Sequence, residues 1–175
     1  MEDAGRPRGD DAESAVQNIL ADPHAHEVFD SSKIPGEIMD LAIVNTRTLH
    51  DNPNFARALV GIWYETLHVM QTDPKARAEM GEASGTDQAG FERQLATTRL
   101  FTTPADAIGF TTGNLPTIMR HVRDLLSEHH LMGWGLGSPA AVDVEFPDHS
   151  VLGARAQVKL RFDDTYMQDA AAGRL

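Results

Sequence analysis

Residues Leu41 to Asn45 of this chain form the stretch LAIVN, in which Leu41 to Val44 are a continuous apolar run between polar neighbours. A run of this length is typical of a strand that is buried on both faces of a sheet. Such a strand needs sheet neighbours and covering helices. Glu27–Asp30 (EVFD) is a short candidate for a neighbouring strand, and Val158–Phe162 (VKLRF) lies more than a hundred residues away. The sequence therefore predicts an α/β fold whose sheet lacks most of its strands, as in a truncated domain.

Helices are predicted over most of the chain after this run. A capping residue followed by proline is a typical helix start, because proline fits the first helical position. Such steps, or a proline near the helix start, predict helices over residues 53–71, 74–83 and 115–130 and one that begins at Thr103-Pro104. Thr86 is predicted to cap a further helix. Asp163 or Asp164 is predicted to cap the last helix, which ends near Gly173. The sequence thus predicts a helix-rich C-terminal part.

Turns and a hairpin complete the predicted elements. Pro35-Gly36 is expected to form a turn in the polar loop 31–40, since this pair suits a β-turn. Residues 142–146 and Val151-Leu152 flank Pro147-Asp148-His149, which predicts a small hairpin. Residues 1–14 are expected to form a disordered tail, because they carry Gly, Pro, Arg and Asp without periodicity.

Composition and charge exclude several function classes. The chain has 15 Lys and Arg against 26 Asp and Glu, a net charge of −11, which argues against nucleic acid and anionic membranes as partners. The absence of cysteine excludes disulfides, thiolate catalysis and Cys-based metal sites. No segment reaches the about 18 apolar residues of a membrane span. The charged N-terminus is not a signal peptide, so the chain as written is predicted to be cytoplasmic.

Motifs for catalysis, cofactors and metals are not found. The sequence has no GxSxG, P-loop or GxGxxG before a helix, and the glycine-rich stretch GWGLGS at 133–138 does not lead into a clear helix. His24 and His26, with Asp22 and Asp30 nearby, lack the i, i+4 spacing of helical zinc ligands. We therefore predict no enzyme, no cofactor and no metal site.

One long block resembles a known family. Residues 28–70, VFDSSKIPGEIMDLAIVNTRTLHDNPNFARALVGIWYETLHVM, are similar to the segment in nitrate, sulfonate, taurine and urea-type solute-binding proteins where the chain leaves the second lobe. There a hinge strand re-enters the first lobe and a helix opens at an Asn-Pro step. ERQLATTRLFTTPADAIGF and VKLRFDDTYMQDAAAGRL resemble a urea-type subgroup whose transporter genes lie near urea carboxylase.

The resemblance implies an incomplete two-lobed periplasmic binding protein of type II. It implies that residues 15–40 are the remnant of a second lobe and residues 41–175 the C-terminal part of the first lobe. The implied function is the solute-binding component of an ABC importer for urea, guanidine or a similar small polar nitrogen compound. The implied partner is the transporter permease, and the full-length family is periplasmic or extracellular. A complete member has a signal peptide and more of both lobes, which this sequence lacks.

Six residues are candidate ligand contacts. Loop residues Ser31, Ser32, Glu37 and Asp40 precede the predicted hinge strand, and their oxygens suit amide or guanidinium N–H groups. The alternative is a solvated turn. Tyr64 and Glu65 do not share the apolar face of the helix on which Trp63 lies, so they are expected to point to a cleft or to water, whereas Trp63 is expected in the core.

Two other functions remain open from the sequence. Synthases of the thiamine pyrimidine precursor share the fold that the resemblance implies, but their signatures are rich in histidine and cysteine, and this chain has no cysteine. The second alternative is a fragment without solute binding, either a degenerate product or a helical piece that binds a partner.

Overall fold

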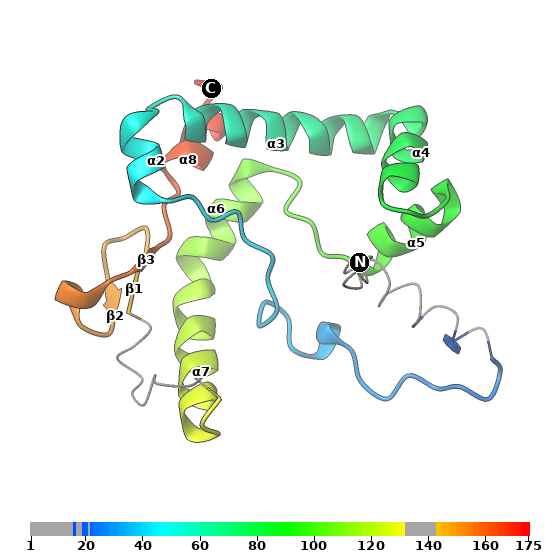
Figure 1. The fold of residues 1–175 in the computed structure, drawn as a ribbon, viewed down its shortest axis with the longest axis horizontal. Coiled ribbons are helices and arrows are strands. Elements are labelled where there is room, and N and C mark those ends of the chain that lie inside the picture. The colour runs from blue at the N-terminus through cyan, green and yellow to red at the C-terminus, as the bar shows by residue number, and fades with distance from the viewer. Residues whose placement is uncertain (1–15, 17–18, 21, 132–142) are drawn as a thin grey trace, which may run out of the picture. The chain divides into compact units, whose positions relative to one another are not determined.

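The computed structural model describes residues 16, 19, 20, 22–131 and 143–175 of the chain. It is a mixed α/β, helix-rich structure with a small sheet (Figure 1). The chain divides into two compact units. The first unit comprises the described residues up to Lys33 together with Leu67–Leu100, and the second comprises Ile34–Thr66 and Phe101–Leu175. The helix α3 (Phe55–Thr72) contributes residues to both.

The first unit is built on the helices α4 (Pro74–Ala83) and α5 (Gln88–Thr97), which pack against each other. The Asp73 side chain caps α4 by accepting a hydrogen bond from the backbone N–H of Lys75 at 2.8 Å, and Pro74 occupies the first turn. This start confirms the helix predicted at the Asp73-Pro74 step. A 3-10 turn, η1 (Ser31–Lys33), also belongs to this unit.

The predicted cap of the next helix is wrong by one residue. Thr86 does not cap α5, because its N–H closes the end of α4 by bonding to the carbonyl of Gly81 at 2.9 Å. The N–H of Gly85 bonds to Glu82 in the same turn, which is the pattern of a Schellman motif. Asp87 is the cap instead, and its carboxylate accepts from the Gly90 N–H at 2.7 Å.

The second unit contains most of the remaining elements. Its helices are α2 (Thr46–Asp51), the start of α3, α6 (Pro104–Gly113), α7 (Leu115–Glu128) and α8 (Thr165–Ala171), with a 3-10 turn η3 at Arg155–Gln157. Helix α6 packs against both α7 and α8. At the start of α6, Thr103 accepts from the Asp106 N–H and donates to the Asp106 carboxylate, which confirms the predicted helix start.

A three-stranded sheet in this unit has the order β2-β1-β3. Strand β1 (Val144–Glu145) pairs antiparallel with β2 (Val151–Leu152), which confirms the predicted hairpin. Strand β3 (Leu160–Arg161) pairs parallel with β1, with Glu145 opposite Arg161. The predicted strand 158–162 is therefore present in its second half.

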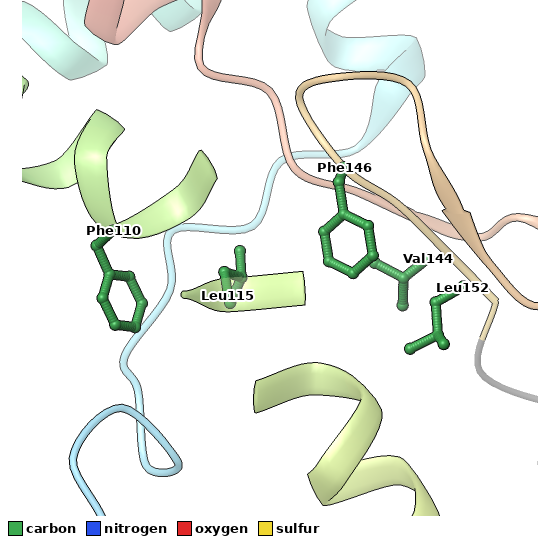
Figure 2. Close-up of a cluster of buried hydrophobic side chains, with 5 residues drawn as sticks. All are labelled: Phe110, Leu115, Val144, Phe146 and Leu152. Carbon is green, nitrogen blue, oxygen red and sulfur yellow. The ribbon is translucent and has the colours of Figure 1, made fainter. Parts of the chain in front are cut away.

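The buried core of the second unit joins this sheet to the α6–α7 corner. In Figure 2, Leu115 at the start of α7 lies between Phe110 of α6 and the three sheet-side residues of the cluster. Those residues are Val144, Phe146 and Leu152. Side chains from the N-terminal loop and from the segment after β3, including Met39 and Phe162, pack around the cluster. The first turns of α7 thus pack against this cluster through Leu115, Ile118 and Met119.

The predicted buried strand at Leu41–Asn45 is wrong. These residues form neither strand nor helix, and Figure 1 shows the chain drawn out between the turn at Pro35-Gly36 and α2. Leu41 is 46% and Ile43 is 75% exposed, so the run is not buried on both faces. No strand in the described part of the chain pairs with it. An apolar run becomes a strand only when neighbours satisfy its backbone groups.

The predicted strand EVFD is also wrong. Residues 27–30 have no regular structure, and the Val28 side chain is 96% exposed. The predicted tail at 1–14 and the predicted loop at 133–139 lie outside the described residues. None of the helices in the described ranges combines the length and apolar composition that crossing a bilayer requires.

Candidate functional site

Glu37 is the candidate contact that the fold positions most firmly. The turn at Pro35-Gly36 is confirmed by a hydrogen bond from the Glu37 N–H to the Ile34 carbonyl at 3.1 Å and by a φ of +88° at Gly36. The Gly36 backbone lies directly on the side chains of Phe110 and Ile118. This close approach fixes the backbone from which the Glu37 side chain projects.

The Glu37 carboxylate pairs with one imidazole. Its Oε1 lies 3.2 Å from Nδ1 of His121 on α7, and the side chains are 23% and 66% exposed, respectively. The carboxylate therefore lies at the edge of solvent, with His121 as its one partner among the described residues. A carboxylate in this setting has further lone pairs for N–H donors, and a planar nitrogen compound is a suitable donor.

The other candidates in the second unit are less constrained. Asp40 and Glu65 are exposed, and neither makes a hydrogen bond or ion pair within the described part of the chain. Tyr64 is partly buried, and this desolvation raises the pKa of its hydroxyl, with a further rise from the negative charge of Asp106. Trp63, expected in the core, is instead 54% exposed.

Ser31 and Ser32 belong to the first unit, in η1. The backbone N–H of Ser32 donates to the Asp30 carboxylate at 2.8 Å, and the Ser32 hydroxyl donates to the same oxygen. These bonds lower the pKa of Asp30, whereas a hydrogen bond to Asp30 raises the pKa of Glu27. The polar groups of Ser32 therefore stabilise the local turn through hydrogen bonds to Asp30. The six candidates are divided between the two units.

His24 and Asp22 bond to each other within residues 22–26. His24 bonds to its neighbour Asp22 through both its backbone N–H, at 2.9 Å, and its ring Nδ1, at 3.1 Å. The backbone bond is the main reason why the pKa of Asp22 is lowered. Across the residues that the structure describes, no three His, Asp or Glu side chains gather as metal ligands would.

A charged cluster on the sheet was not predicted from the sequence. Glu145 of β1 accepts from Nε of Arg161 at 2.7 Å, and Nδ1 of His149 lies 3.1 Å from its other oxygen. Arg155 approaches the same oxygen to 3.9 Å. The bonds from Arg161 and then His149 hold the pKa of Glu145 below its usual value, although burial opposes this shift. The alternation of VKLRF placed Arg161 on a strand, but the parallel register opposite Glu145 had no sequence signal.

Asp143 lies on the same side of β1 as Glu145 and is 1% exposed. Its Oδ2 accepts from the Ala154 N–H at 2.9 Å. Its Oδ1 has no hydrogen-bond partner in the described part of the chain. The carboxylate thereby fastens the turn after β2, where Gly153 has a φ of +106° and approaches the Asp143 side chain closely.

No family model, no curated protein and no solved structure matches this chain.

Proposed function

We propose that this chain is part of the solute-binding component of an ABC importer, and that its solute is a small nitrogen compound such as urea or guanidine. The two-lobed type II fold, the permease as partner and a place of action outside the cytoplasmic membrane are parts of the same proposal. They rest on the resemblance of residues 28–70 and the two later stretches to that family.

The observation that carries the proposal is the fixed position of Glu37. Gly36 packs on Phe110 and Ile118, so the loop backbone is held against α6 and α7. The Glu37 carboxylate is then presented beside His121 at the edge of solvent. A preorganised carboxylate binds a guanidinium or amide N–H without first losing the conformational freedom of the loop.

Two further features support a positively charged or neutral polar solute. Asp40 lies exposed three residues after Glu37 and adds a second carboxylate to the same loop. The net charge of −11 attracts cations to the whole chain. In this proposal Leu41–Asn45 is the segment that connects the two lobes.

Calorimetry tests the proposal. Guanidinium, urea and short amides are titrated into the chain at constant ionic strength. Because the chain supplies part of a cleft, we expect weak saturable binding of one of them, with a Kd on the order of 1 mM. Glu37→Gln should abolish the heat, and Glu82→Gln, which removes the same charge from an exposed position on α4, should not.

The absence of saturable heat for every compound overturns the proposal. Equal loss of heat in both variants also overturns it, because binding would then depend on net charge alone.

A further inference from the structure

The side chains around Glu145 come from elements whose backbone positions are defined by hydrogen bonds. Arg161 lies on β3 opposite Glu145 on β1, and the pair is fixed by the sheet register. Arg155 begins η3 directly after the turn that Asp143 fastens, and its Nη2 donates to the His149 carbonyl at 2.6 Å. The cationic groups therefore come from β3, from the turn after β1 and from η3, and they meet at the Glu145 carboxylate.

The two guanidinium groups keep most of their donors. Each has five N–H donors, and in the described part of the chain Arg161 uses only Nε and Arg155 only Nη2 for hydrogen bonds. The side chains of Arg161, Arg155 and His149 are 53%, 67% and 81% exposed, respectively, whereas that of Glu145 is 11% exposed. The carboxylate is thus turned inward and the donors face solvent.

The charge of this segment differs from that of the whole chain. Residues 143–161 contain three carboxylates and three Arg or Lys side chains, so this segment is neutral although the whole chain carries −11. At the cluster itself, one carboxylate faces two guanidinium groups and an imidazole. The two guanidinium charges therefore exceed the single carboxylate charge that they contact.

We propose that Arg155 and Arg161, with His149 beside them, form a binding site for a small oxyanion, namely a phosphate or carboxylate group. Arginine presents paired N–H groups that match two oxygens of such an anion. Glu145 acts as a positioning residue, because it orients Arg161 and limits the repulsion between the two guanidinium groups. This inference does not depend on the proposed nitrogen solute, which has the opposite charge preference and other residues.

NMR titration of the full chain tests the site. Inorganic phosphate and succinate are added in separate titrations at constant ionic strength, with chloride as the reference anion. We expect saturable shifts at the side-chain signals of Arg155, Arg161 and His149, and the tighter of the two anions identifies the ligand class. Arg155→Gln should weaken binding about fivefold or more, because it removes one guanidinium.

Arg93→Gln is the matched control, since it removes the same charge from an exposed position on α5. Arg155 is exposed and makes one hydrogen bond, so its replacement leaves the fold intact, which the unchanged amide spectrum of residues 143–152 checks. The proposal is overturned if phosphate and succinate cause the same chemical-shift changes as chloride. It is also overturned if Arg155→Gln and Arg93→Gln weaken anion binding equally.

Discussion

Arg57 on α3 donates from Nη2 to Oδ2 of Asp169 on α8 at 2.7 Å, although the two residues are 112 positions apart in the sequence. The same arginine donates from Nη1 to the carbonyl of Arg174 at 2.8 Å. The Arg174 guanidinium in turn donates to the other oxygen of Asp169 at 2.8 Å. One carboxylate thus fastens the C-terminal helix and the residues after it to α3.

Replacing this carboxylate is expected to destabilise the second unit. Asp169→Asn removes the negative charge and one of the two oxygens that accept from Arg57 and Arg174, so the free energy of unfolding should fall by about 1–3 kcal/mol. Urea unfolding measures the change. Asp124→Asn removes an exposed carboxylate on α7 that pairs with the adjacent Arg123, and should change stability by less than about 0.5 kcal/mol. Equal effects of both variants would show that the Arg57–Asp169 bond stabilises the fold no more than an exposed ion pair does.

Gly36 is expected to tolerate no side chain. A Cβ there would lie 2.8 Å from Cδ1 of Ile118 and 2.9 Å from Cζ of Phe110, and the backbone has a φ of +88°. Gly36→Ala should therefore cost roughly 2–4 kcal/mol in thermal or urea unfolding. Gly109→Ala is the control, because nothing lies within 4 Å of a Cβ at this position in α6. It should stabilise the chain by up to about 1 kcal/mol, since alanine favours helix.

Replacing Gly153 by alanine is expected to destabilise the chain more than replacing Gly85, which also has a positive φ but has no neighbouring atoms within 4 Å of a Cβ. A Cβ at Gly153 would collide with Oδ1 of Asp143, whereas a Cβ at Gly85, whose φ is +80°, would meet nothing within 4 Å. Gly85→Ala should cost about 1 kcal/mol from backbone strain alone. Gly153→Ala should cost at least about 1–2 kcal/mol more, because the clash adds to the strain. Equal costs in urea unfolding would contradict the close Asp143 contact.

Stability should depend on pH through Glu145. Its hydrogen bond from Arg161 lowers its pKa in the folded state relative to the ordinary value of 4.5, so the ionised form stabilises the fold. This contribution is complete above the unfolded pKa and is lost as the pH falls through the lower, folded pKa. The difference in melting temperature between the wild type and Glu145→Gln should be largest near pH 7 and shrink below about pH 4.5. A difference that stays constant down to pH 3 would contradict this assignment.

The helix starts could be predicted from local sequence, since capping needs only neighbouring residues. Asp73 and Thr103 cap the helices predicted at the following prolines. Helix α2 was missed, although its cap Asn45, which accepts from the Arg47 N–H at 2.9 Å, was a usable signal. The residue had been assigned to the end of a strand. The apolar run LAIVN, which favours a strand, therefore outweighed the helix cap at Asn45 in the prediction.

The sheet and the charged clusters could not be predicted in the same way. LAIVN is apolar enough for a buried strand, but its neighbours decide whether it becomes one, and periodicity does not reveal neighbours. The parallel pairing that brings Arg161 to Glu145, and the helix contact that brings Arg57 to Asp169, depend on tertiary packing. Of the candidate ligand contacts, Glu37 gained a defined environment only through the packing of Gly36 on α6 and α7.

The role of Glu37 in solute binding is the central claim, and an NMR titration of guanidinium into the chain tests it most directly. The account predicts saturable shifts at the Glu37 carboxyl and the His121 ring, because the solute shares the carboxylate with the imidazole 3.2 Å away. These shifts should be absent in Glu37→Gln and unchanged in Glu82→Gln. Shifts that never saturate, or that spread evenly over all exposed carboxylates, would contradict the claim.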